Sequence, residues 1–249
     1  MSAMKIYFYY YGKFVLGIAS IAVFLYMYIQ NPENLNFASE AHWIGVDIFW
    51  VILFIDLAWR FIPGKFHHIG QQKYLKRNFA PSKAYEKTGK LSEQELAHKK
   101  TTDKRAAFTL GAFFIMNAVW FLFYCIGIFR PQELFGIMLL YFIGDMICVF
   151  GICPFRLIFM RNRCCNVCRI YNWDAIMLVT PLMLVPTWYS WTLGAIAIIY
   201  TLVWEISYHK HPERFYDSSN VRLNCNQCKH GMCPYRYKKR KNKKNTKVS

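Results

Sequence analysis

Acidic residues are scarce in this 249-residue chain, which has 14 Asp and Glu against 31 Lys and Arg. Hydrophobic residues nevertheless make up 55% of the sequence, and aromatic residues 18%. A soluble protein with this much apolar surface and a formal charge of +17 would be difficult to fold and to keep in solution. The apolar residues form long runs with the basic residues between them, which is typical of a multi-pass membrane protein.

Charge is nearly missing from six stretches of the sequence. A helix needs about 20 consecutive apolar residues to cross the hydrocarbon of a bilayer. Four of the stretches reach this length, and one of these four contains no charged residue at all. The last two are shorter and are separated around Pro186. The six stretches are 6–29, 43–63, 106–129, 134–153, 175–188 and 191–208.

The distribution of Lys and Arg predicts six crossings with both termini in the cytoplasm. In that topology 30 of the 31 basic residues lie on the cytoplasmic side, and only Arg130 lies outside. Retention of basic residues on the cytoplasmic side is the usual topology signal. A single crossing by 175–208 would instead require the basic tail to be translocated. The sequence therefore predicts an all-α integral membrane protein, a six-helix transmembrane bundle in a bacterial inner membrane or an equivalent membrane.

This topology divides the chain into four regions. A helix is expected to begin inside the one sizeable inner loop, because Ser92 and Glu95 have the spacing of a capping box. The four regions are transmembrane helices 1 and 2 in 1–63, a basic cytoplasmic loop with a short helix in 64–105, transmembrane helices 3 to 6 with a Cys-rich loop at 153–172 in 106–208, and a Cys-rich, polybasic cytoplasmic tail in 209–249.

The end of the tail is a block of positive charge, with seven Lys and Arg between Lys238 and Lys247. Beside a membrane such a block attracts anionic lipid headgroups, at about 1 kcal/mol per basic residue near the surface. RNA would need the same charges, but no stacking platform or nucleic-acid motif accompanies them. We therefore expect the bilayer and its anionic headgroups as partners, and no specific nucleic acid. A tail that only fixes topology and keeps the chain soluble is an equally good interpretation.

Seven of the nine cysteines fall on the cytoplasmic side in this topology. The other two, Cys125 and Cys148, lie inside predicted helices and are interpreted as small hydrophobic residues. The cytoplasm is a reducing compartment, which argues against a framework of disulfides. Metal binding or redox chemistry is the better explanation for the seven.

Four of these cysteines form two Cys-x2-Cys pairs. A tight turn at this spacing points both sulfurs at one ion, and two pairs complete a tetrahedral site of four thiolates. The 56 residues between the pairs contain the fifth and sixth predicted crossings, which return the tail to the side that it left. The predicted metal ligands are Cys165, Cys168, Cys225 and Cys228, with Cys153, Cys164 and Cys233 as further candidates.

The metal that these thiols would bind is an iron–sulfur cluster or zinc. Seven thiols exceed the four that a single structural zinc needs, which favours the cluster. A protein without any metal is the third interpretation. Five arginines at positions 156, 161, 163, 169 and 222 would offset the negative charge of either kind of site.

Asp145 lies near the centre of the fourth predicted crossing. An aspartate at that depth costs about 2.5–3.5 kcal/mol on insertion scales, so it needs a partner or a proton. Tyr141 shares its helix face. Asp145 and Tyr141 are therefore candidates for a proton relay, or for hydrogen bonding to a quinone headgroup. The structural alternative is an interhelical hydrogen bond from Asp145 that orders the bundle, for example to Asn117. Asp56 and Arg60 are expected to neutralise each other locally.

Several motifs with known chemistry are missing, namely a nucleotide-binding loop, a serine-hydrolase elbow, HExxH and CxxCH. Whether the protein is an enzyme therefore stays open. We predict a membrane iron–sulfur electron-transfer component whose cysteine metal site lies at the cytoplasmic face, with a redox partner protein or a quinone as electron partner. The alternative is a zinc-stapled membrane scaffold or transport component with no redox chemistry.

Overall fold

The computed structural model describes residues 3–39, 42–63, 70–150, 153–162 and 164–224, and in these ranges the chain is helical and contains no strand. Six α-helices coincide with the six apolar stretches, and one short helix lies in the loop before α4. The α-helices are α1 (Ala3–Gln30), α2 (Ile44–Trp59), α3 (Lys83–Thr88), α4 (Glu93–Cys125), α5 (Pro131–Phe150), α6 (Asp174–Met183) and α7 (Trp188–Lys210). A π-helix, Phe155–Phe159, and five short 3-10 turns complete the described chain, the turns being Pro32–Leu35, Lys76–Asn78, Cys165–Val167, Pro212–Arg214 and Val221–Leu223.

Four of the described helices are long and apolar enough to cross a membrane, namely α1, α4, α5 and α7. The multi-pass membrane character that the sequence predicts is therefore supported by the fold. At 1.5 Å per residue, α2 is about 24 Å long and α6 about 15 Å, while the hydrocarbon is about 30 Å thick. Pro181 lies inside α6, and Pro186 follows soon after its end. Crossings by α2 and α6 thus remain a prediction.

The start of α4 is fixed by the predicted capping box. The Ser92 hydroxyl accepts a hydrogen bond from the Glu95 N–H at 3.3 Å, and the Glu95 carboxylate accepts one from the Ser92 N–H at 2.6 Å. From there α4 continues without a break to Cys125. The last third of the predicted inner loop and the third predicted crossing are therefore parts of one helix, about 50 Å long.

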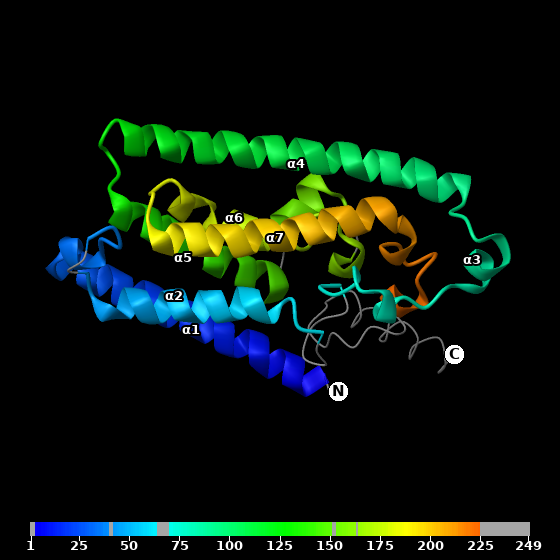
Figure 1. Ribbon diagram of the computed structural model, residues 1–249, viewed down its shortest axis with the longest axis horizontal. Coiled ribbons are helices and arrows are strands. Elements are labelled where there is room, and N and C mark those ends of the chain that lie inside the picture. Colours follow the sequence, from blue (N-terminus) through cyan, green and yellow to red (C-terminus); the bar gives the residue numbers. More distant parts are fainter. Residues whose placement is uncertain (1–2, 40–41, 64–69, 151–152, 163, 225–249) are drawn as a thin grey trace, which may run out of the picture.

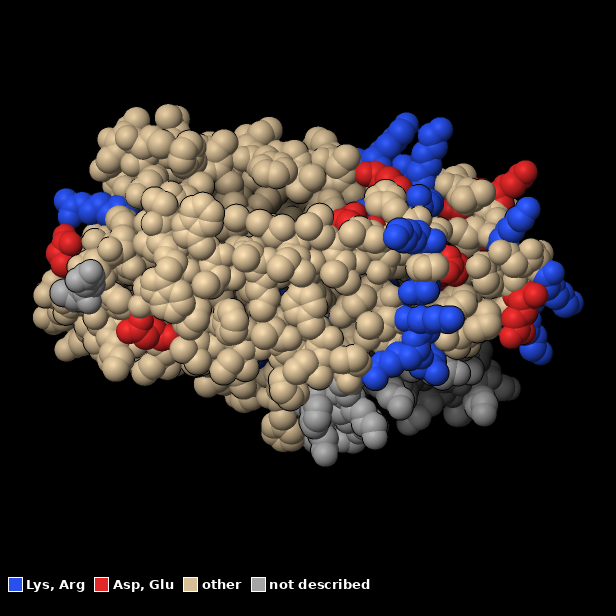
Figure 2. Space-filling view, viewed as in Figure 1, with Lys and Arg blue, Asp and Glu red and all other residues tan. Residues whose placement is uncertain are grey.

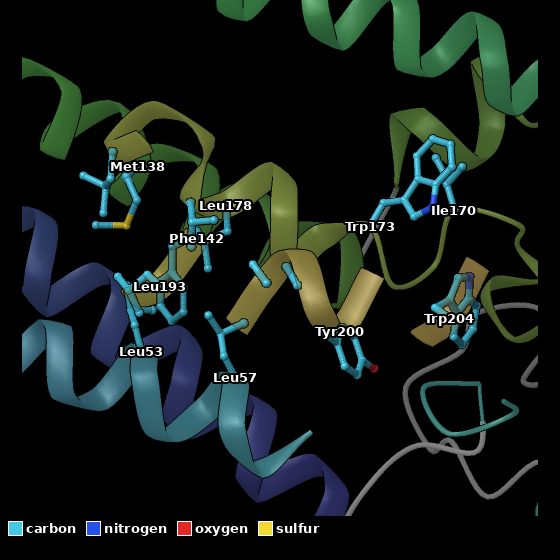
Figure 3. Close-up of a cluster of buried hydrophobic side chains, with 14 of the residues drawn as sticks. Leu53, Leu57, Met138, Phe142, Ile170, Trp173, Leu178, Leu193, Tyr200 and Trp204 are labelled. Carbon is cyan, nitrogen blue, oxygen red and sulfur yellow. The ribbon is translucent and has the colours of Figure 1, made fainter. Parts of the chain in front are cut away.

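The helices pack around α5, α6 and α7, with α4 along one side and α1 and α2 along the other (Figure 1). In this arrangement α6 contacts α5 and α7, α1 contacts α5, α2 contacts α7, and α4 contacts α6 and the π-helix. Large apolar residues from these elements fill the interior (Figure 3). The labelled members of this core are Leu53, Leu57, Met138, Phe142, Ile170, Trp173, Leu178, Leu193, Tyr200 and Trp204.

Charge is strongly segregated along the molecule. Figure 2 shows Lys and Arg gathered over one end, around α3 and the last turns of α7, and an almost uncharged band over the rest of the bundle. We call the first region the basic end. The few charged side chains at the other end include Arg130, which forms an exposed ion pair with Glu33 at 3.1 Å. This separation matches the placement of basic residues on one side of a bilayer.

At the basic end, two segments that are far apart in the sequence lie side by side. The Val221 N–H donates to the Ala80 carbonyl and the Ser82 N–H to the Ser219 carbonyl, both at 2.9 Å. The chain that follows α7 therefore returns to the segment that follows α2. Its last described residue is Asn224, directly before the tail cysteines.

Candidate functional site

A cavity of about 440 Å³ lies between α4, α5, α6 and the Cys-rich loop. Most of its lining is apolar. Asp145 and Tyr141 of α5 face it, as does Arg156 of the π-helix. Five cysteines also line the cavity, namely Cys148, Cys153, Cys164, Cys165 and Cys168. We call this space the thiol cavity.

Cys153 stands between the end of α5 and the π-helix. A hydrogen bond from the Cys148 thiol lowers the pKa of Cys153 to about 6 in spite of its burial, and the Arg156 N–H, 3.4 Å from Sγ, acts in the same direction. Burial instead raises the pKa of Cys165 to about 11, although the Arg156 guanidinium lies 3.6 Å from its sulfur. Burial also raises the pKa of Cys168. Of these three thiols, Cys153 is the one whose pKa is lowered, which favours its thiolate form.

A fully buried lysine holds the Cys-rich loop in place. The Nζ of Lys73 donates to the carbonyl of Asn166 at 2.8 Å and to that of Cys168 at 3.0 Å. It also lies 4.9 Å from the ring centre of Trp204. Burial lowers the pKa of Lys73 to about 7. The lysine belongs to the segment after α2, so it ties this segment directly to the loop that carries the cysteines.

Beside this lysine, Arg169 anchors the loop to two helices. Its guanidinium binds both carboxylate oxygens of Glu205 in α7 and lies 3.3 Å from Asp103 in α4. It also stacks 3.8 Å from the ring centre of Tyr208. The Trp173 indole donates to Glu205 at 2.7 Å. These contacts give the loop a fixed position under the ends of α4 and α7.

The predicted metal ligands are only partly within the described chain. Cys153, Cys164, Cys165 and Cys168 meet at the thiol cavity, whereas Cys225, Cys228 and Cys233 lie outside the described residues. Among the residues that the structure describes, no three Cys, His, Asp or Glu side chains are arranged to hold a metal ion. Thiol donors suit zinc or an iron–sulfur cluster. The described cysteines alone nevertheless do not form such a site.

Cys148 also belongs to this group of thiols, which the sequence interpretation missed. It was taken as a small hydrophobic residue because it lies inside a predicted crossing. Its position three residues after Asp145, on the same helix face, was the available signal. Both residues line the thiol cavity.

Charged side chains from α1, α2 and α6, all less than 20% exposed, form a second polar group near the basic end. Lys13 of α1 binds Asp56 of α2 at 2.8 Å, and the Tyr9 hydroxyl donates to the same carboxylate at 2.7 Å. Arg60 lies 3.3 Å from Asp56 and 2.6 Å from Asp174 at the start of α6. The predicted pair of Asp56 and Arg60 is therefore present, but as part of a larger network that joins three helices.

The two other residues discussed with Asp145 have partners of their own. The Tyr141 hydroxyl accepts from the Trp120 indole at 3.0 Å. The side-chain amide of Asn117 donates to the Phe113 carbonyl at 2.9 Å, one turn back in α4. Within the described ranges no hydrogen bond joins Asn117 to Asp145, and an interhelical bond from Asp145 to another partner stays a prediction.

Comparison of this chain with protein families, with curated proteins and with solved structures found no match.

Proposed function

We propose that the protein is a redox component embedded in a membrane, with both termini on the cytoplasmic side of a bacterial inner membrane or its equivalent. It would pass electrons between a cysteine-ligated iron–sulfur cluster at the basic end and a quinone-type molecule in the thiol cavity. One observation carries the proposal: five thiols and Asp145 line the same largely apolar cavity. Apolar walls with a few polar groups are typical of sites for small lipid-soluble molecules.

The proposed ligand set is Cys165 and Cys168 of the loop with Cys225 and Cys228 of the tail, and it depends on the tail for completion. Two ties support this convergence. Lys73 joins the segment after α2 to the loop, and the same segment, at Ala80, binds Val221, four residues before Cys225. When bound, a cluster would supply one-electron transfer.

The surrounding residues have distinct roles in this proposal. The Arg156 guanidinium, beside the Cys165 sulfur, offsets the negative charge of a thiolate. Asp145 and Tyr141 face the cavity from adjacent turns of α5, where they can bind a carbonyl oxygen or move a proton to it. A redox partner protein is the other candidate electron partner.

The test is metal analysis and an optical spectrum of anaerobically purified protein. We expect iron and sulfide with broad visible absorbance, both lost in the double variant Cys165→Ser/Cys168→Ser. Cys125→Ser is the matched control, because Cys125 is exposed on α4 and does not line the cavity. Colourless protein containing stoichiometric zinc would contradict the cluster.

That result would favour the second candidate, a zinc-stapled scaffold or transport component. The contacts that already bind loop, tail and the segment after α2 together are what a structural joint requires. In that case a chelator would lower the thermal stability of the protein, and no redox-active absorbance would be found. The polybasic block Lys238–Lys247 would serve either function by binding anionic lipid headgroups.

A further inference from the structure

A second, smaller cavity of about 40 Å³ adjoins the thiol cavity toward the basic end. Its lining comes from α1, α2, α5, the start of α6 and the loops that precede α3 and α6. Asp145 and Asp174 face both cavities. We call this space the chamber, and its polar lining includes Lys13, Arg60, Gln71, Asp145, Asn172 and Asp174.

Four residues that line the chamber each have a buried polar atom without a described hydrogen-bond partner. Three are acceptors, namely Gln71 Oε1, Asn172 Oδ1 and Asp174 Oδ1, and one is a donor, Arg60 Nε. None of the four has a hydrogen-bond partner among the described residues. Asn172 and Arg60 are buried to 1% and 4% exposure, so bulk solvent does not satisfy them. Buried polar atoms are almost always hydrogen-bonded, which makes four such atoms around one space a sign of a bound ligand.

Water fits this space in size and in chemistry. A water molecule needs about 10–15 Å³ of such volume and two to four polar partners. A cavity of about 40 Å³ therefore has room for a small cluster. Water can donate to the three acceptors and accept from Arg60, whereas a cation would meet Lys13 and Arg60 in the same lining.

The charges around the chamber do not balance. Asp56 is paired with Lys13 and Arg60, and Asp174 with Arg60. For Asp145 no ion pair exists within the described part of the chain. A carboxyl group at this depth without a counter-ion is stable when it carries a proton. The charged and titratable groups that face it are Tyr10 and Lys13 of α1, Asp56 and Arg60 of α2, Cys148 of α5, Tyr171 of the loop and Asp174 of α6.

We infer that the chamber holds ordered water and forms a proton route between the basic end and Asp145. Asp145 would give its proton to an acceptor bound in the thiol cavity, and would regain one from the chamber water beside Asp174 and Gln71. The inference rests on the proposed function only for the identity of that acceptor. The presence of water in the chamber and the exchange of the Asp145 proton do not depend on a bound metal or quinone.

The first test is hydroxyl-radical labelling of the full chain by X-ray pulses, followed by mass spectrometry. Radicals formed from bound water oxidise the side chains beside it. Tyr10 lines the chamber and is 5% exposed, while Phe49 is 6% exposed and lies in the apolar core. We expect oxidation of Tyr10 to be several-fold faster than that of Phe49. Similar background rates at both rings would mean a dry chamber.

A pair of glutamine variants gives an independent test of the water. Gln71 and Gln132 each have a buried Oε1 without a described partner, but only Gln71 faces the chamber. Loss of a bond to water destabilises a protein, whereas removal of a truly unpartnered oxygen does not. We expect Gln71→Leu to lower the melting temperature and Gln132→Leu to leave it unchanged or raise it. Equal effects would overturn the inference.

Infrared spectroscopy tests whether Asp145 carries a proton and how fast that proton exchanges. At neutral pH the protein should show a carboxylic acid band that disappears in Asp145→Asn. On mixing with heavy water this band should shift quickly, and more slowly in Gln71→Leu. Absence of a band that depends on Asp145, or equally slow exchange in both proteins, would refute the route. Repeating the experiment with Cys165→Ser/Cys168→Ser separates the two proposals, because loss of the metal site should leave the band unchanged.

Discussion

Two clusters of charged side chains, one around Arg169 of the Cys-rich loop and one around Asp145 of α5, differ in how fully their groups are paired. In the Arg169 cluster, Glu205 accepts from the guanidinium and from the Trp173 indole, and Asp103 accepts from Arg169 and from the Tyr208 hydroxyl. Asp103, which is 34% exposed, also pairs with Lys99 at 3.7 Å. The two carboxylates of this cluster therefore face two cations, and water reaches the more exposed one.

The Asp145 cluster has the opposite character. Its cations, Lys13 and Arg60, form ion pairs with Asp56 and Asp174. The third carboxyl group, that of Asp145, faces both cavities and has no ion pair among the described residues. A fully bonded buried network holds its elements in one arrangement, whereas an incomplete one must take up water, a proton or a ligand. The comparison indicates that the Arg169 cluster is structural, and it supports our proposal that the Asp145 cluster takes part in proton transfer.

Among the variants that distinguish the two clusters, the largest loss of unfolding free energy is expected from Glu205→Gln. Among the described residues, this change leaves the Arg169 guanidinium, which is 6% exposed, with the more distant Asp103 as its one counter-ion. Removal of one partner from a buried ion pair costs about 3–5 kcal/mol, and the partial exposure of Glu205 reduces this to about 2–3 kcal/mol. The measurement is the free energy of unfolding in detergent micelles. Glu86→Gln, at an exposed position of α3, is the control, and an equal effect there would remove the structural role of Arg169.

A smaller loss of unfolding free energy is expected from Lys73→Met. Methionine is one atom shorter than lysine and uncharged, so it donates no hydrogen bond to the carbonyls of Asn166 and Cys168 and loses the cation–π contact with Trp204. Two buried acceptors then lose a partner, at a cost of about 1–3 kcal/mol. Lys76→Met, an exposed neighbour, should be neutral. Faster proteolysis within the Cys-rich loop of Lys73→Met would locate the effect, and an unchanged unfolding free energy would show that Lys73 does not hold the loop.

Asp145→Asn should change stability least among the buried carboxyl groups. A protonated aspartate and an asparagine have the same charge and nearly the same shape, so the free energy of unfolding should stay within about 1 kcal/mol. Asp56→Asn is the contrast, because it removes the partner that Lys13 and Arg60 share. If both variants lost stability equally, Asp145 would be an ionised structural residue and the comparison between the clusters would fail.

The sequence predicted the positions of the helices better than it predicted which side chains pair between them. Apolar stretches and the capping box at Ser92 are local signals, and each led to a helix in the expected place. Asp56 and Arg60 were paired because they are four residues apart in one helix. The ties of Asp56 to Lys13 and of Arg60 to Asp174 join residues 43 and 114 positions apart, and no local pattern encodes them.

The cysteines illustrate the same limit. The spacing of Cys165 and Cys168 predicted a site in the Cys-rich loop. Both residues do line the thiol cavity, together with Cys153 and Cys164 of the same loop. Cys148 was set aside because residue type and position inside a helix do not reveal which neighbour a side chain will face. Whether the tail completes the site depends on residues outside the described chain.

The smallest effect concerns an ion pair at the other end of the molecule. Burial lowers the pKa of His42, but bonds to Asp47 and to the Ser39 carbonyl outweigh it and hold the pKa above its ordinary value. The folded state then binds more protons than the unfolded state near neutral pH. Its contribution is therefore complete below about pH 6.5 and is lost as the pH rises through the higher folded value.

Because Asp47 is 40% exposed, this contribution should be less than about 1 kcal/mol. Unfolding free energies measured between pH 6 and pH 8 should fall slightly in the wild type and less in His42→Gln. This pair, whose carboxylate is 40% exposed, thus provides a more solvated reference for the two clusters. If His42→Gln cost as much as Glu205→Gln, burial would not be the reason that the Arg169 cluster stabilises the fold.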